Sequence, residues 1–297
     1  MGLIGVTFLL VHLVPGDPAR NLVGITGTKE QVDLVREQLG LNDPLLFQFA
    51  DYLRGLVRGD LGTSFITGQP VTELLGQRLP VTTELAGLGV LIVLLCGFPI
   101  GIAVAASQSR GGRRWIGSSF TSGAGAIGAL PEYVIGTILI LLFALTLHIF
   151  PAQGGPGPRE MLLPAITVAL APTAVFARLV RNETATVLEQ EYIATAKSKR
   201  LPRPRLYLRH VLPNVVTSSL TFGGLILISL LGSTVIAENV FNIPGLGTQI
   251  VQAILSSDYP VIRAIILVLG LLSILITVVI DIVLASVDPR TLTRTTL

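Results

Sequence analysis

Long apolar stretches with almost no charged residues alternate with polar segments along this chain. A helix rises 1.5 Å per residue, so about 20 apolar residues cross the roughly 30 Å hydrocarbon core of a bilayer. A segment in lipid must pair its own backbone amides, so we expect each stretch to be a helix. Six stretches qualify, at residues 1–14, 81–107, 115–150, 161–177, 210–237 and 264–280.

Two of these stretches have unusual lengths. Residues 1–14 are too few to cross comfortably, so we expect that the native chain starts upstream of Met1 or that this helix is truncated. Residues 115–150 exceed one crossing, and Pro131 and Glu132 lie in their middle. They form either two spans joined by a turn or one long helix kinked at Pro131.

The composition agrees with a membrane protein. The chain is 51% hydrophobic and only 13% charged, with a mean hydropathy of +0.73. Soluble domains carry about 25% charged residues because their surfaces face water. The single cysteine and the three histidines lie far apart, so we expect neither a disulfide framework nor a metal site.

The basic residues indicate how the chain crosses the membrane. They gather at 110–114, at 178–209 and at Arg290 and Arg294 in the tail. If 115–150 is one kinked span, all three groups lie on the same side, which the positive-inside rule makes cytoplasmic. Two spans there would place the most basic segment outside. We therefore predict an all-α membrane protein of about six spans with both termini inside.

This count divides the chain into three parts. Residues 1–14 form the first helix, 15–80 an extracytoplasmic helical loop, and 81–297 a five-helix core with a cytoplasmic connection at about 182–211. In the loop, Thr28 and Gln31 have the spacing of a capping box. In the core, Gly97 and Gly101 are spaced for close helix packing, although glycine is also simply common in membrane helices.

The segment 181–213 is polar and helix-prone. It predicts a short helix at 182–199, a turn near Pro202 and Pro204, and a second helix entering the membrane at Leu212 and Pro213. A charged loop that only fixes topology is the alternative on spacing alone.

The residues of this segment resemble a known motif. Glu191-Tyr192-x-x-Thr195-Ala196-x-x-Lys199, followed by Leu212-Pro213, is similar to the coupling loop of permease subunits of ABC importers. The resemblance is to the dipeptide and oligopeptide branch, which also covers nickel and glutathione importers. Further matching pieces occur in the same order, at 15–18, 59–64, 238–241, 244–247, 258–260 and 288–290.

The resemblance implies that the loop forms a coupling helix that docks on a cytoplasmic ATPase. Tyr192 is then an aromatic contact, Ala194 and Ala196 allow close packing, and Glu191 and Lys199 set the alignment. The chain contains no Gly-Lys dipeptide and hence no phosphate-binding loop of the Gly-x-x-x-x-Gly-Lys type. It is therefore expected to be a transport subunit rather than an enzyme.

The expected partners follow from the same resemblance. They are a second, similar permease, two ATPase subunits that hold ATP and Mg, and an extracytoplasmic solute-binding protein, in a bacterial or archaeal plasma membrane. The solute remains open among dipeptides, oligopeptides, nickel chelates and glutathione. Arg200 departs from the family, which usually has glycine there to end the helix in a left-handed conformation. Either the turn differs or Arg200 adopts that strained conformation.

Charged residues elsewhere suggest two further sites. Glu132, beside Pro131, is a candidate for the wall of a translocation path, because buried charge in a span is costly. Arg263 and other charges near span ends are explained by side chains that reach the interface. The outer rim is expected to include six residues, namely Glu238, Pro244, Gly245, Gly247, Asp258 and Tyr259.

The sequence argues against two other classes of protein. A stand-alone secondary transporter driven by an ion gradient tends to have more spans, internal repeats and broken mid-membrane helices. A membrane enzyme needs clustered His, Asp, Glu or Cys at one depth, and the sequence has no such cluster.

Overall fold

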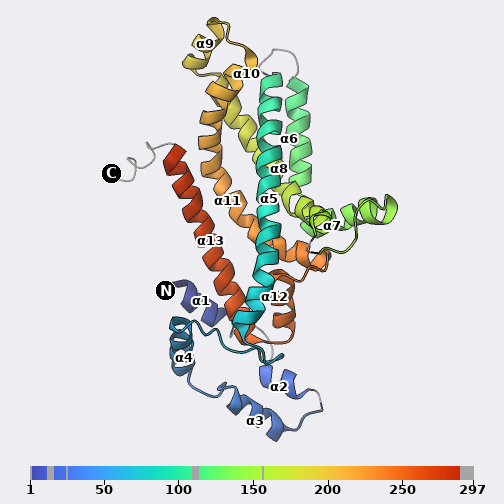
Figure 1. Ribbon diagram of the computed structural model, residues 1–297, viewed down its shortest axis with the longest axis vertical. Helices are drawn as coiled ribbons and strands as arrows, with labels where there is room; N and C mark the ends of the chain where they lie inside the picture. The colour runs from blue at the N-terminus through green and yellow to red at the C-terminus, as the bar shows by residue number, and fades with distance from the viewer. Residues whose placement is uncertain (1, 12–16, 25, 109–113, 156, 288–297) are drawn as a thin grey trace. The chain divides into compact units, whose positions relative to one another are not determined.

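The computed structural model describes residues 2–11, 17–24, 26–108, 114–155 and 157–287 (Figure 1). Within these ranges every regular element is a helix, apart from one isolated bridge between Thr63 and Pro70. The predicted all-α class is therefore confirmed. The chain separates into two compact units, Met1–Thr83 with Ile243–Leu272 (unit 1) and Glu84–Asn242 with Ser273–Leu297 (unit 2).

Four helices in the described residues are long and apolar enough to cross a membrane. They are α5 (Val71–Gln108), α8 (Pro158–Leu188), the part of α11 (Leu212–Val240) from Gly223 onward, and α13 (Tyr259–Val287). A bent pair, α6 (Arg114–Gly128) with α7 (Glu132–Leu139) and its continuation, makes a fifth if it counts as one span. The remaining predicted span corresponds to α1 (Gly2–Val11), whose ten residues are shorter than a crossing.

Unit 1 contains the short helices of the segment expected outside the membrane. These are α2 (Pro18–Val23), α3 (Lys29–Gln38) and α4 (Leu45–Val57). The predicted capping box is confirmed, because Thr28 and Gln31 exchange hydrogen bonds between side chain and backbone at the start of α3. After α3 the chain turns at Gly40, whose φ of 65° is easily adopted by glycine.

Helix α5 begins ten residues earlier than the sequence predicted. The apolar stretch was expected from residue 81, but the helix starts at Val71. Val71, Leu74 and Leu75 have helical spacing and are buried in the core of unit 1. Glu73 lies among them, and Arg78 and Pro80 separate them from the apolar stretch, which concealed their pattern in the sequence. That core also includes residues of α12 (Leu246–Leu255) and of the first turns of α13.

Unit 2 is built around α8. In its most apolar stretch 72% of the residues are buried, compared with 11% for α13. Figure 1 shows α5, α8 and α11 running alongside one another. The Phe176 ring of α8 is fully buried between Gly97 of α5 and Gly223 of α11, where an added Cβ would lie 2.6 Å and 2.5 Å from ring carbons.

The Gly97–Gly101 pair therefore serves close packing rather than occurring by chance. A Cβ at Gly101 would lie 2.6 Å from the Ala177 carbonyl oxygen of α8. Small residues at both positions let the α5 backbone approach α8, which is a common way for helices to associate in lipid.

The predicted kinked helix over 115–150 is interrupted. Helix α6 ends at Gly128, α7 starts at Glu132, and the two are bent by 96°. Pro131 lacks an amide proton and restrains Leu130 to an extended conformation, so α6 cannot continue through it. Helix α7 then runs into a π-helix, Ile140–Thr146. The expectation of one continuous kinked helix is wrong, and the pair is a broken span or a re-entrant loop.

Candidate functional site

The candidate coupling segment follows α8 and consists of three short helical pieces. They are α9 (Glu191–Ser198), α10 (Arg203–Leu206) and the π-helix η2 (Tyr207–Val211), which leads into α11. The single helix predicted over 182–199 is wrong, because α8 continues to Leu188 and the chain is extended at Gln190 (φ −68°, ψ 146°). Neither proline nor glycine marks this break in the sequence.

Helix α9 has an inner and an outer face. Ile193 and Ala196, three residues apart, are 0% and 6% exposed, so they attach the helix to unit 2. The break before α9 permits this burial, because the helix turns back instead of continuing outward. Ala196 is therefore an inner contact of this chain and is unavailable as the close-packing surface predicted for a partner.

The other predicted coupling residues of α9 and its end lie on the surface. They are Glu191, Tyr192, Ala194, Thr195 and Lys199. Tyr192 is 44% exposed, which is high for a large aromatic ring and suits a contact with another protein. Partial burial raises the pKa of the Tyr192 hydroxyl above its usual value.

Lys197 contributes a contact that the sequence interpretation missed. Its Nζ donates a hydrogen bond to the Leu188 carbonyl oxygen, 3.3 Å away at the end of α8. The last carbonyl groups of a helix lack partners within the helix, and a lysine near that end supplies one. Lys197 therefore fixes α9 to the end of α8. Because the sequence does not mark the end of α8, it offered no signal for this contact.

Arg200 resolves the alternative that the sequence left open. Its φ is 53°, the left-handed conformation, and its amide donates to the Lys197 carbonyl oxygen at 3.0 Å. The turn is therefore of the kind that glycine favours, and Arg200 adopts the strained conformation.

The entry into α11 accommodates a proline by widening the helix. The Leu212 amide donates to the Tyr207 carbonyl oxygen, five residues back, as in a π-turn. Pro213 follows directly and has no amide proton. Leu212 is half-buried and Pro213 is exposed, so these two predicted residues shape the connection to α11.

Glu132 lies between α7 and α11. Its Oε1 accepts a hydrogen bond from the Ser233 hydroxyl of α11, whereas its Oε2 is buried without a partner. Pro131, immediately before it, is exposed and extended (ψ 139°) and starts α7. No local pattern points to Ser233, which is 101 residues away in the chain. A carboxylate with one unsatisfied oxygen is costly within a span.

Asp258 links two of the motifs that carried the family resemblance. Its carboxylate accepts hydrogen bonds from the Ser64 hydroxyl and, at 3.0 Å, from the Phe65 amide. Asp258 is only 3% exposed, and Gly62 of the same loop lies against Pro260. The motifs at 59–64 and 258–260 thus form one structure within unit 1, and Asp258 holds the loop in place.

The predicted outer rim needs correction. Glu238 is fully buried in unit 2, and Gly245, Gly247 and Asp258 are buried in unit 1. The Leu246 amide donates to Thr82 Oγ1 at 2.8 Å, so the 244–247 turn fixes the start of α12. Pro244 is exposed and Tyr259 is half-buried. Most of this set therefore stabilises the fold and offers no surface for contact.

Some predicted features lie outside the described residues. They are the first two residues of the 15–18 motif, the basic residues Arg110 and Arg113, and the tail with the 288–290 motif, Arg290 and Arg294. The start of the chain before Gly2 belongs to the same group.

Family models match almost the whole chain. The model described as "Binding-protein-dependent transport system inner membrane component" matches residues 97–293, and the model of the N-terminal part of such components matches residues 2–86.

Curated relatives match at similar length. A putative peptide transport system permease protein of Brucella abortus is 36% identical over 292 residues, covering 96% of this chain and 92% of its own. A glutathione transport system permease protein of Salmonella typhimurium is 36% identical over 282 residues, covering 95% and 91%. A probable peptide ABC transporter permease protein of Sinorhizobium fredii is 34% identical, covering 98% and 94%.

A solved structure shares the fold. A chain of the MetNI methionine ABC transporter in an inward-facing conformation superposes with a TM-score of 0.63 at 16% identity. The match covers 73% of this chain and 97% of that chain.

Proposed function

Because the chain belongs to the family of inner-membrane components of binding-protein-dependent transport systems, we propose that it imports peptides or peptide-like solutes with energy received through α9. The chain is a multi-pass permease subunit of an ABC transport system. Relatives named for peptide and for glutathione transport support the class of solute, since glutathione is itself a small peptide.

The two-faced structure of α9 is the observation that carries the coupling role. A helix that transmits force has to be attached firmly to its own chain and exposed to its partner. Ile193 and the Lys197–Leu188 hydrogen bond provide the attachment. Tyr192 and Glu191, on the exposed side, provide a surface of the kind that becomes the centre of a protein interface.

The source of energy is proposed to lie on other chains. The sequence contains no Gly-Lys dipeptide, so two separate ATPase subunits would hold ATP and Mg. A second permease and a solute-binding protein would complete the assembly. The basic residues around α9 and α10 support a cytoplasmic location for this end, in a bacterial or archaeal cell, by the positive-inside rule, and the same rule supports the proposal that both termini lie inside.

Glu132 is proposed to line the translocation path. Its unsatisfied Oε2 is costly in an apolar surrounding and would be stabilised by water or by a polar solute. The break at Pro131 frees backbone groups at the same place, and non-helical backbone at membrane depth is tolerated where it lines a wet cavity. The ion-gradient transporter considered as an alternative is disfavoured by the family membership.

The coupling role is tested by reconstituting the permease pair with its ATPases and binding protein in vesicles. Tyr192→Glu puts a charge at the centre of the exposed face, and Glu191→Lys reverses one at its edge. We expect both variants to assemble less ATPase and to lose most solute-stimulated hydrolysis and uptake. Tyr192→Phe keeps the ring and should retain most of both.

A matched control uses a neighbouring glutamate. Glu189→Lys makes the same change of charge two residues away, at the exposed end of α8 and outside α9. It should leave hydrolysis and uptake close to wild type. If Tyr192→Glu couples hydrolysis to uptake as well as Glu189→Lys does, α9 is not the coupling element.

A further inference from the structure

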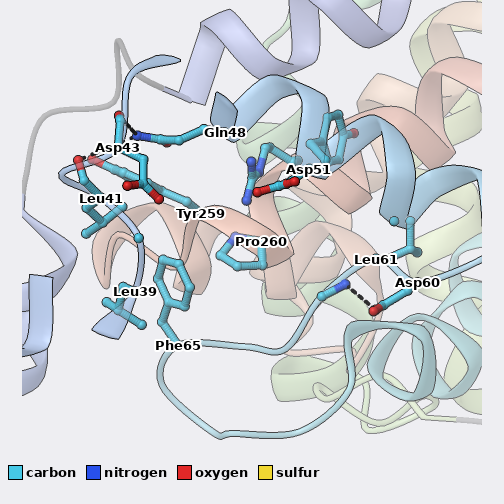
Figure 2. A pocket seen from close by; sticks show the side chains of 15 residues that line it. Leu39, Leu41, Asp43, Gln48, Asp51, Asp60, Leu61, Phe65, Tyr259 and Pro260 are labelled. Atoms are coloured by element: carbon cyan, nitrogen blue, oxygen red, sulfur yellow. Dashed lines mark hydrogen bonds between the residues drawn. The ribbon is translucent and has the colours of Figure 1, made fainter. Parts of the chain in front are cut away.

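Unit 1 contains a cavity of about 260 Å³ that has no part in the proposed coupling role of α9. Helix α4, the 60–65 loop and the first turn of α13 line it, together with the turn that follows α3. Figure 2 shows Asp43, Phe65 and Tyr259 among its lining side chains. Pockets for drug-sized ligands usually measure about 300–1,000 Å³, so this cavity suits a smaller solute.

A cation without an anionic partner lines this cavity. The Arg263 guanidinium lies over the Tyr52 ring, 5.0 Å from its centroid, and over the Phe8 ring at 5.9 Å. Within the described part of the chain no hydrogen bond or ion pair reaches Arg263, and its Nε is buried. The sequence interpretation, in which Arg263 reaches the membrane interface, does not explain an arginine held between aromatic rings beside a cavity.

An anion without a partner lines the same cavity. Among the residues described, none donates a hydrogen bond to the Asp43 carboxylate or forms an ion pair with it, whereas Asp51 is paired with Arg54 at 2.7 Å. Asp43 and Arg263 also form no ion pair with each other. The hydroxyl of Tyr52, a third lining group, is buried without a partner.

From this arrangement we infer that the cavity binds a small zwitterion of amino-acid to dipeptide size. The carboxylate of the ligand pairs with Arg263 and the Tyr52 hydroxyl, and its ammonium group pairs with Asp43. A guanidinium favours a carboxylate because its N–H groups form parallel hydrogen bonds. Aromatic rings such as those of Phe65 and Tyr259 offer a favourable surface to an ammonium group.

The presence of one positive and one negative side chain in the same cavity explains why a zwitterion fits better than a simple ion. An anion alone would satisfy Arg263 but would be repelled by Asp43 and the neighbouring carboxylates. A cation alone would leave the partly buried guanidinium unpaired, which is the costlier situation. A ligand that carries both charges satisfies both groups at once.

This inference rests on the proposed transport of peptide-like solutes and adds a recognition site for them. It is tested by binding alone, without ATP or uptake, on the full chain assembled with its partner subunits but without the solute-binding protein. The probes are L-alanyl-L-alanine, its C-terminal amide and its N-acetyl derivative, measured by isothermal titration. Because turnover plays no part, failure of the α9 coupling test would leave this result unaffected, and the reverse also holds.

We expect the free dipeptide to bind and each blocked derivative to bind about tenfold more weakly, since each loses one charged hydrogen-bonded group. Arg263→Gln should weaken the free dipeptide about tenfold and should no longer distinguish it from the amide. Asp43→Asn should likewise weaken the free dipeptide about tenfold and should no longer distinguish it from the acetylated derivative. Asp43 is exposed, so its replacement is compatible with folding even if Arg263→Gln is not.

Asp33→Asn is the matched control, because Asp33 is an exposed aspartate of α3 that does not line the cavity. It should bind all three probes as the wild type does. The inference is overturned if the free dipeptide does not bind, if the blocked derivatives bind equally well, or if Asp43→Asn behaves like Asp33→Asn.

Discussion

Replacing Gly97 by alanine should destabilise unit 2 through a single contact. An added Cβ would lie 2.6 Å from Phe176 Cδ1, whereas carbon atoms normally approach to about 3.5–4.0 Å. The ring has little room to move away, because the Gly223 backbone lies so close on its other side that an added Cβ there would be 2.5 Å from Cε2. Overpacking of this kind costs about 1–3 kcal/mol, and the immobile ring favours the upper end.

Alanine also has a benefit that must be subtracted. It favours a helix by about 1 kcal/mol relative to glycine, so the net loss for Gly97→Ala is about 2 kcal/mol. The control is Gly87→Ala in the same helix, where an added Cβ would meet nothing within 4 Å. That change should stabilise the protein slightly, so the two variants should differ by about 3 kcal/mol.

The assay is thermal unfolding of the purified protein in detergent micelles. A loss of about 2 kcal/mol should lower the Tm by roughly 5 °C relative to wild type. Adding Phe176→Leu removes the clashing ring edge, so the double variant should lose less stability than the sum of the single changes. Equal Tm values for Gly97→Ala and Gly87→Ala would refute the close approach of α5 to Phe176.

Three further predictions concern single side chains. Asp258→Asn weakens the acceptor for Ser64 and the Phe65 amide, so we expect a loss of about 1.5–3 kcal/mol and faster proteolysis of the 59–70 loop. Arg200→Gly relieves about 1–2 kcal/mol of left-handed strain but costs about 0.4–1 kcal/mol of chain entropy, so we expect an unchanged or slightly raised Tm. A lowered Tm would contradict the presence of strain at Arg200. Glu132→Gln retains an acceptor for Ser233 and removes the charge, so the Tm should hold while uptake slows, and unchanged uptake would exclude Glu132 from the path.

Features that depend on local sequence were predictable. The capping box at Thr28 and Gln31 needs only four residues in order, and the apolar stretches reveal the spans because lipid contact demands continuous hydrophobicity. The left-handed conformation at Arg200 was also predictable, since helices often end with one residue in that conformation.

Features that depend on tertiary contacts were not predictable. The Ser64–Asp258 hydrogen bond joins residues 194 positions apart, and no local spacing reveals which of the outer polar groups will meet. The early start of α5 was not predicted for a related reason: Val71 is buried by residues of α12 and α13 rather than by lipid. The break at Gln190 has no helix-breaking residue, and burial of Ile193 in unit 2 accompanies it.

The packing of unit 2 gives a physical reason for the proposed role of α9 in moving the spans. Helix α9 is held in unit 2 by the buried Ile193, and the Lys197–Leu188 hydrogen bond joins it to the end of α8. Twelve residues earlier in α8, Phe176 packs against α5 and α11 at two glycines, with no free space on either side. Close-packed contacts of this kind transmit displacement because they have little room to deform. A push on the exposed face of α9 would therefore reach three spans through α8, whereas a loosely attached loop would absorb it.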